Sequence, residues 1–374
     1  MNKKKITAVL LALLLVVAYL FSGKIINKLY LRGYEKEKIQ GVNRYETIIS
    51  CGEGYWHNPK EAILINTNDI GAAMNAVPYA YANNIPLLLT EKGDLPSEIY
   101  SFISKNHLNK VYILGGINTI SKPIERTIER TGADVERIVQ KNRGDVSKLF
   151  AELTVKKTKS KEMFVVFDGK NGYSIGVSVL GKAAEKGIPI LTVNESNLYK
   201  AAEFARENGI EKTYVIGRFN DLSGTVDKVL PNVQRISGKD KYEVNRNVIE
   251  AFYDMDKVDK VYVAKGGNLI NGKDLNVGEF VNSIAAVPRM AKSGEPILIN
   301  DTNYIQDDAM DFLKKYNIKK LCSVGFEIKK TSVINLDSDI ARIVTSFILI
   351  VMIVMTAYHV LNKCKIMQSI YDSE

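Results

Sequence analysis

The stretch Ile85-Pro-Leu-Leu-Leu-Thr90 decides the fold of this chain, because it occurs three times. It returns as Ile188-Pro-Ile-Leu-Thr-Val193 and again as Glu295-Pro-Ile-Leu-Ile-Asn300. The spacing is about 100 residues, which is the length of a small domain rather than of a solenoid turn. The sequence therefore predicts three tandem copies of one module.

A second marker lies upstream of each copy and shows where the copies begin. Asn43-Arg-Tyr-Glu46 in the first copy corresponds to Asn142-Arg-Gly-Asp145 in the second and to Asp240-Lys-Tyr-Glu243 in the third. We predict modules at residues 41–139, 140–234 and 235–333.

Within a copy, short apolar runs alternate with segments of helical spacing. The strands predicted for the first copy are 62–66, 87–89, 111–114 and a closing strand at 135–139. The helices predicted for it are 45–52, 71–83, 96–106 and 121–129. Strands that are apolar throughout are typical of a parallel sheet with helices on both faces. We therefore predict an α/β fold built from three modules.

Both ends of the chain are apolar. Residues 6–23 carry no charge and follow three lysines, and residues 343–361 are uncharged apart from one histidine near their end. Each run is long enough to cross a bilayer. We predict a transmembrane signal-anchor in 1–26, a transmembrane helix at 342–361 and a cytoplasmic tail at 362–374.

Each apolar run has an alternative interpretation. The first resembles a cleaved signal peptide, although large residues stand where the peptidase needs small ones. The second resembles a buried core helix, although it lacks a polar face. Two spans place both termini on one side, and the short basic start favours the cytoplasm for them. The predicted location is the cell membrane, with the repeat region extracytoplasmic.

The charge of the chain restricts its partners. The formal net charge is +9, and part of this excess lies on the repeat region. It mildly favours an anionic partner and is far from the basic footprint of a nucleic-acid-binding protein. A solvated surface with slightly more lysine than glutamate explains the same number.

The chemistry-bearing residues predict neither a metal site nor a cofactor. The histidines His57, His107 and His359 are isolated, so they form no metal cluster or nucleophile triad. For an enzyme acting on envelope glycans or nucleotides, the candidate carboxylates are Asp69, Glu91 and Asp168. Trp56 lies beside Tyr55 and His57, in a loop where its ring is able to stack on a sugar. The sequence favours a non-catalytic protein.

Three segments carry a resemblance to a known family. They are Gly41-Val-Asn-Arg-Tyr-Glu-Thr47, Ala76-Val-Pro78 before the strand at 86–89, and Tyr112-Ile-Leu-Gly-Gly116. The repeat region resembles the clostridial-type cell wall binding repeat 2 family. The resemblance implies Rossmann- or Toprim-like modules packed as a pseudo-threefold trimer. It also implies non-catalytic binding to an anionic polysaccharide of a Gram-positive cell wall, at the cell surface.

The resemblance also implies which residues serve polymer attachment. The aliphatic positions of its strand motif are Leu87, Leu88, Leu89, Ile190, Leu191, Ile297, Leu298 and Ile299. By composition alone these are buried strand residues, which set module packing rather than grip a charged polymer. Arg44, Arg143 and Lys241 share one repeat position and offer one cation each, either to an anionic group or to a structural ion pair.

The second copy departs furthest from the family pattern. It has Gly144 where the other copies have tyrosine, and its third strand ends in Gly217-Arg218 rather than Gly-Gly. The aspartate of the family's Phe-Pro-Asp-Ala segment is replaced by Ala72, Ile175 and Asn282. Polymer binding is therefore one hypothesis. A scaffold that binds another envelope protein is a second.

Overall fold

The computed structural model describes residues 33–221, 223–267, 269–270, 274–275 and 277–329. Residues 34–328 form one compact unit. The predicted signal-anchor (1–26), second transmembrane helix (342–361) and tail (362–374) lie outside the described residues. Among the helices that the structure does describe, none is long and apolar enough to cross a membrane.

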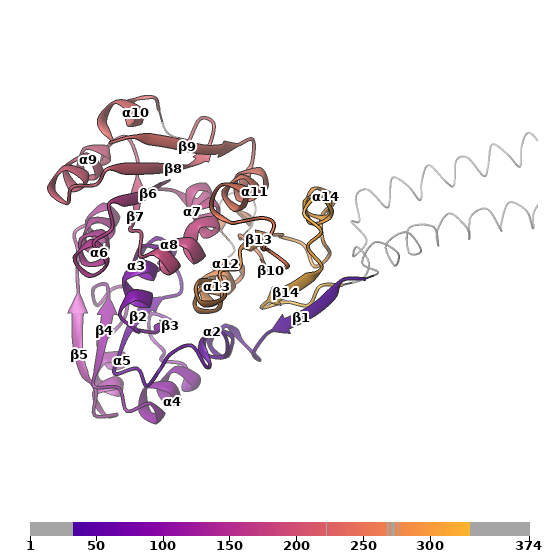
Figure 1. Ribbon diagram of the computed structural model, residues 1–374. Coiled ribbons are helices and arrows are strands. Elements are labelled where there is room, and N and C mark those ends of the chain that lie inside the picture. The colour runs from indigo at the N-terminus through magenta and orange to yellow at the C-terminus, as the bar shows by residue number, and fades with distance from the viewer. Residues whose placement is uncertain (1–32, 222, 268, 271–273, 276, 330–374) are drawn as a thin grey trace, which may run out of the picture. The chain divides into compact units, whose positions relative to one another are not determined.

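Three parallel four-stranded sheets carry the fold (Figure 1). The first has the order β3 (Leu87–Thr90), β2 (Glu61–Asn66), β4 (Lys110–Leu114), β5 (Asp134–Ile138). The second has the order β7 (Ile190–Val193), β6 (Glu162–Phe167), β8 (Lys212–Arg218), β9 (Val233–Gly238). The predicted α/β class is confirmed, because the strands of both sheets pair in parallel and β2, β3, β6 and β7 are almost wholly buried.

The third sheet takes its fourth strand from the beginning of the described chain. Its order is β13 (Ile297–Ile299), β10 (Lys260–Ala264), β14 (Lys320–Val324), β1 (Glu35–Ile39). β1 runs parallel to β14, with Glu35 opposite Lys320 and Ile39 opposite Val324. β5 and β9 hold the same edge position in the first two sheets, so the strand before each opening motif pairs with the preceding module. β1, which lies outside the three predicted modules, joins the first module to the third.

The helices repeat in the same way as the strands. The opening helices are α2 (Arg44–Gly52), α6 (Arg143–Thr158) and α11 (Lys241–Phe252). The inner helices are α3 (Ile70–Ala82), then α7 (Lys170–Gly176), η1 (Val177–Val179) and α8 (Leu180–Lys186), then α12 (Val277–Ala285) and α13 (Val287–Ser293). The outer helices are α4 (Ser97–Lys105), α5 (Lys122–Glu129), α9 (Leu198–Glu207), α10 (Thr225–Val229) and α14 (Asp307–Lys315). A short antiparallel pair, β11 (Leu269–Ile270) and β12 (Asp274–Leu275), follows β10.

Each opening helix packs on the inner helices of the preceding module. α6 lies against α3, α11 against α7, and α2 against α12. The inner helices also meet between the sheets, where α8 contacts both α3 and α13, and α3 contacts α12 (Figure 1). One hydrophobic cluster consequently runs through all three modules and includes Ile63, Phe164 and Tyr262 from the three sheets. Burial of this shared apolar surface stabilises the modules as a group.

The contact between the first and third modules is reinforced at the end of α2. Arg289 of α13 donates to the carbonyl oxygens of Ser50 and Cys51 at 3.0 Å each. These bonds satisfy carbonyl groups that a helix end leaves without intrahelical partners. The guanidinium of Arg289 also lies 5.1 Å from the ring centroid of Tyr55, which favours a cation–π contact.

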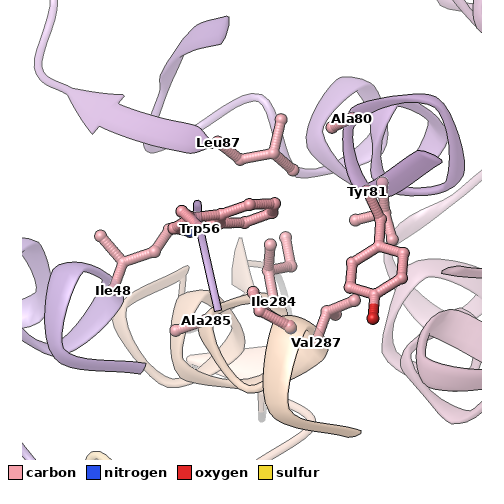
Figure 2. Close-up of a pocket in the computed structure, with 10 residues that line it drawn as sticks. Ile48, Trp56, Ala80, Tyr81, Leu87, Ile284, Ala285 and Val287 are labelled. Atoms are coloured by element: carbon pink, nitrogen blue, oxygen red, sulfur yellow. The ribbon is translucent and has the colours of Figure 1, made fainter. Parts of the chain in front are cut away.

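Trp56 inserts into the same interface. Figure 2 shows its indole between Leu87 of β3 and Ile284 and Ala285 of α12. The remaining cavity has a volume of about 20 Å³ and apolar walls. The indole therefore fills most of the space between the two modules, and its ring packs edge-on to Tyr81 at a centroid distance of 6.4 Å.

Proline substitution in β1 tests whether this strand closes the third sheet. Glu35 N donates to Lys319 O, and Ile39 O accepts from Gly325 N, so the odd-numbered residues of β1 face β14. Glu37→Pro removes a ladder donor, and we expect it to lower the free energy of unfolding by about 1–3 kcal/mol. Lys38→Pro is the matched control, because its N–H points away from β14. Equal losses in urea denaturation of the two variants would contradict this pairing.

Candidate functional site

The opening motif forms a tight N-terminal cap for its helix. Asn43 Oδ1 accepts from the backbone N–H groups of Tyr45 at 3.0 Å and Glu46 at 2.9 Å. Glu46 Oε2 in turn accepts from Val42 N at 2.6 Å. A Cβ atom at Gly41 would lie 2.5 Å from Glu46 Cβ, which explains the glycine. The motif therefore has a structural reason at each of these positions.

The same cap occurs in the third module. Asp240 accepts from Tyr242 N and Glu243 N, and Glu243 Oε2 accepts from Lys239 N at 2.7 Å. A Cβ atom at Gly238 would lie 3.0 Å from Glu243 Cβ. The two caps aim the next residues of the motif at the carboxyl ends of the strands, which is where α/β proteins place their sites.

The motif tyrosines each bond a carboxylate at that edge. Tyr45 Oη donates to Glu91 Oε1 at 2.6 Å, and Thr67 Oγ1 donates to the same oxygen at 3.0 Å. Tyr242 Oη donates to Asp301 Oδ2 at 2.9 Å. Burial, and then the adjacent carboxylate, raise the pKa of both phenols well above the usual value. Both phenols are therefore hydrogen-bond donors rather than proton-transfer groups at neutral pH.

The second module builds this pair from other residues. A Cβ atom at Gly144, which replaces the motif tyrosine, would lie 2.9 Å from Asn197 Nδ2. Tyr173 of α7 donates instead to Asp168, which follows β6. Asn194 Nδ2 donates to the second oxygen of Asp168 at 3.2 Å. This replacement was not predicted from the sequence, where the available signal was a tyrosine close behind an aspartate at the end of a strand.

The three cations at the shared repeat position differ in their surroundings. Lys241 forms an ion pair with Asp301, whose side chain is 1% exposed, and donates to Gly267 O at 3.1 Å. Arg44 lies 4.0 Å from Glu91, and both side chains are about 40% exposed. The structural ion pair considered for this position is therefore present in the third module and weak in the first.

Arg143 is the exposed member of the three. Its guanidinium carbon lies 5.9 Å from the ring centroid of Tyr173, and it joins no ion pair within the described residues. Burial raises the pKa of Asp69, which follows β2 at the carboxyl edge of the first sheet, and Arg143 partly offsets that rise. Arg143 thus brings positive potential to the boundary between the first two modules.

The eight aliphatic candidates lie inside the sheets. Their exposed fractions do not exceed 9%. Leu87 and Leu89 belong to the central cluster, whereas Leu88 points to the outer layer of its module. Ile190, Leu191, Ile297, Leu298 and Ile299 occupy the equivalent strands β7 and β13. Side chains at this depth act through packing, because they have no surface to offer a polymer.

The carboxylates considered for catalysis are placed at the same edges. Glu91 and Asp168 accept hydrogen bonds from tyrosines, and Asp69 has one buried oxygen without a partner. In the part of the chain that the structure describes, no group of three or more histidine, cysteine, aspartate or glutamate side chains is arranged to hold a metal ion.

The different depths of the two ion pairs generate a prediction. Asp301→Asn removes a buried carboxylate that pairs with Lys241 and accepts a hydrogen bond from Tyr242, and we expect a loss of about 3–5 kcal/mol in the free energy of unfolding. Glu91→Gln is the matched variant, and we expect at most about 1 kcal/mol, because the Arg44 pair is long and exposed. Urea denaturation followed by circular dichroism measures both. A smaller loss for Asp301→Asn than for Glu91→Gln would refute the ranking.

Curated relatives match much of the chain. The N-acetylmuramoyl-L-alanine amidase LytC of Bacillus subtilis is 25% identical over 290 residues, which are 77% of this chain and 55% of LytC. The amidase enhancer of the same organism is 29% identical over 235 residues, which are 62% of this chain and 31% of the enhancer. The chain thus spans about half of the first relative and a third of the second.

Solved structures share the fold. Cwp8 from Clostridium difficile matches with a TM-score of 0.67 and 27% identity, over 79% of this chain and 50% of Cwp8. Cwp6 from the same organism matches with a TM-score of 0.66 and 24% identity, over 79% of this chain and 46% of Cwp6.

A family model decides the relationship. The model of the cell wall binding domain 2 (CWB2) matches residues 38–125 and 235–335, which together are about half of the chain. These stretches include the two intact opening motifs and the tyrosine–carboxylate pairs that they form. The chain therefore belongs to the cell wall binding domain 2 family.

Proposed function

We propose that this chain is a non-catalytic cell-envelope protein that binds an anionic cell wall polysaccharide through its three modules. Membership of the CWB2 family is the observation that carries the proposal. The match to the amidase LytC and to an amidase enhancer supports a role at the cell wall. The three modules act together, since they share one hydrophobic core.

Arg143 is the cation that we assign to the polymer. An exposed guanidinium without an ion pair among the described residues has donors available for a phosphate or carboxylate group. Lys241 forms a buried ion pair with Asp301, and Arg44 forms a longer, more exposed contact with Glu91. The boundary between the first and second modules is therefore the proposed contact with the polymer's charged groups.

We further propose that both apolar ends anchor the protein in the membrane, with the repeat region outside the cell. The support is the sequence alone: two uncharged runs, each long enough for a bilayer, flank the repeats. With such anchors the protein does not need the wall to stay at the surface. Polymer binding would then connect the membrane to the wall.

A second candidate is a scaffold for another envelope protein. Ile117 and Val139 are 60% and 59% exposed and follow the paired strands β4 and β5 at the carboxyl edge of the first module. Phe219 is 65% exposed and follows β8 in the second module. Apolar side chains at this edge favour a protein partner if the polysaccharide fails to bind. Crosslinking in intact cells that recovers a protein and no glycan would support this candidate.

Polymer retention tests the role of Arg143. The full chain is sedimented with purified anionic wall polysaccharide, and we expect Arg143→Ala to weaken retention about tenfold, because a charge-assisted contact is lost. Arg143→Lys should keep part of the binding, and higher salt should weaken it further. Lys141→Ala is the matched control, since Lys141 is exposed two residues before Arg143, just ahead of α6. Equal retention of the two alanine variants, with melting temperatures unchanged, would exclude Arg143. No retention of the unmodified chain would refute polymer binding.

Membrane anchoring predicts how the protein fractionates. The full chain should remain with membranes after an alkaline carbonate wash, and deletion of both apolar ends should release it, because the apolar anchoring area is removed. N-terminal sequencing of the membrane-bound protein should begin at Met1 or Asn2. A start downstream of residue 23 would instead identify a cleaved signal peptide.

A further inference from the structure

The first module has a groove that the function proposed above does not use. It lies between α2 and α4 and has a volume of about 530 Å³. Ile49, Trp56 and Phe102 contribute apolar walls, and Glu53 and Lys105 contribute charged ones. This volume lies within the range of small-molecule sites in proteins. We call it the α2–α4 groove.

Ion pairs join the opening helix to the outer helix in the other two modules. In the second module Lys148 of α6 lies 2.8 Å from Glu203 and 3.4 Å from Glu207, both on α9. In the third module Lys315 of α14 lies 2.7 Å from Glu250 of α11. These pairs tie the opening helix to the outer helix and occupy the space between them.

The first module has lost these ties. When the opening helices are aligned at their cap residues, Ile49 of the first module corresponds to Lys148 of the second. When the outer helices are aligned at the buried residue that follows each of them, Ser101 and Lys105 correspond to the two glutamates of the second module. Glu53 and Lys105 stand where the third module has its ion pair, yet neither joins an ion pair within the described residues.

The length of the opening helix explains the difference. α2 has 9 residues, whereas α6 has 16 and α11 has 12. α2 ends at Gly52, and Glu53 follows in an extended conformation with ψ of 128°, so its carboxylate leaves the helix surface. Gly54 then turns the chain with φ of 75° and brings Trp56 to the wall of the groove.

The lining indicates the chemistry of a ligand. Trp56 and Phe102 suit the apolar face of a sugar ring. Glu53, Glu98 and Asn106, with Lys105, supply acceptors and donors for hydroxyl groups. Two carboxylates against one ammonium disfavour a phosphate or carboxylate ligand. This distinguishes the groove from the cationic boundary at Arg143.

We propose that the α2–α4 groove binds a short glycan segment made of uncharged or amine-bearing pyranose sugars. The first module then contributes a sugar-binding site of its own, separate from the contact with an anionic polymer. Such sugars occur in the glycan strands of peptidoglycan and in wall polysaccharides, and the ring chemistry is common to both.

The single tryptophan of the chain provides the measurement. Because Trp56 is the only tryptophan, the emission of the chain comes from one residue, which lines this groove and also packs against the third module. The purified full chain is titrated with an N-acetylglucosamine tetramer and with its fully deacetylated counterpart. We expect a saturable change in emission with at least one probe, and the same dissociation constant from calorimetry. Tighter binding of the deacetylated tetramer assigns a role to Glu53 and Glu98, and equal binding assigns recognition to the sugar rings.

A triple variant is designed to fill the groove with ion-paired side chains. Ile49→Lys combined with Ser101→Glu and Lys105→Glu recreates the lysine and two glutamates of the second module. We expect binding to weaken at least about tenfold with no loss in melting temperature. Ser101→Arg should also block the groove by its size. Asp311→Arg is the matched control, because Asp311 is exposed at the corresponding position of α14.

The outcomes separate this site from the proposed polymer contact. Retention on anionic polysaccharide should be unchanged in the groove variants, and Arg143→Ala should leave the tetramer titration unchanged. Absence of a saturable response to both probes overturns the proposal. Binding that persists unchanged in the triple variant overturns it as well.

Discussion

The parallel pairing of β1 with β14 is the contact on which the arrangement of the modules depends. Without it the third sheet lacks the edge strand that β5 and β9 provide in the other two. The same pairing delivers α2 to α12 and sets Trp56 and Arg289 between the first and third modules. Every module therefore contacts both of the others, and one central core runs through all three.

Because the three modules pack on one another, the sequence of each module is able to change only where it does not contact its neighbours. The inner helices must pack on neighbours, so the apolar strands are retained in all three copies. The carboxyl edges are freer, because each tyrosine–carboxylate pair lies within one module. The second module lost the motif tyrosine at Gly144 and regained a tyrosine–carboxylate pair through Tyr173 and Asp168. The first module lost its cross-helix ion pairs and gained a groove.

Parts of the candidate site were predictable and others were not. The repeat position of Arg44, Arg143 and Lys241 was evident from the opening motifs. Their environments were not, because the partners come from distant segments: Asp301 lies 60 residues after Lys241 and at the end of another strand. The burial of the aliphatic strand motif was foreseeable, since an uninterrupted apolar run has no polar face for water.

The sequence by itself determined the number of modules, their parallel α/β class and their family, because these depend on local patterns that repeat. An apolar run in a strand and a capped helix are encoded within a few neighbouring residues. Only the tertiary structure decided that residues 35–39 complete the third sheet, that Arg143 stays exposed and that α2 leaves a groove beside α4. These features depend on strand order and on where a helix ends against another element, and both are set by contacts between residues far apart in the chain.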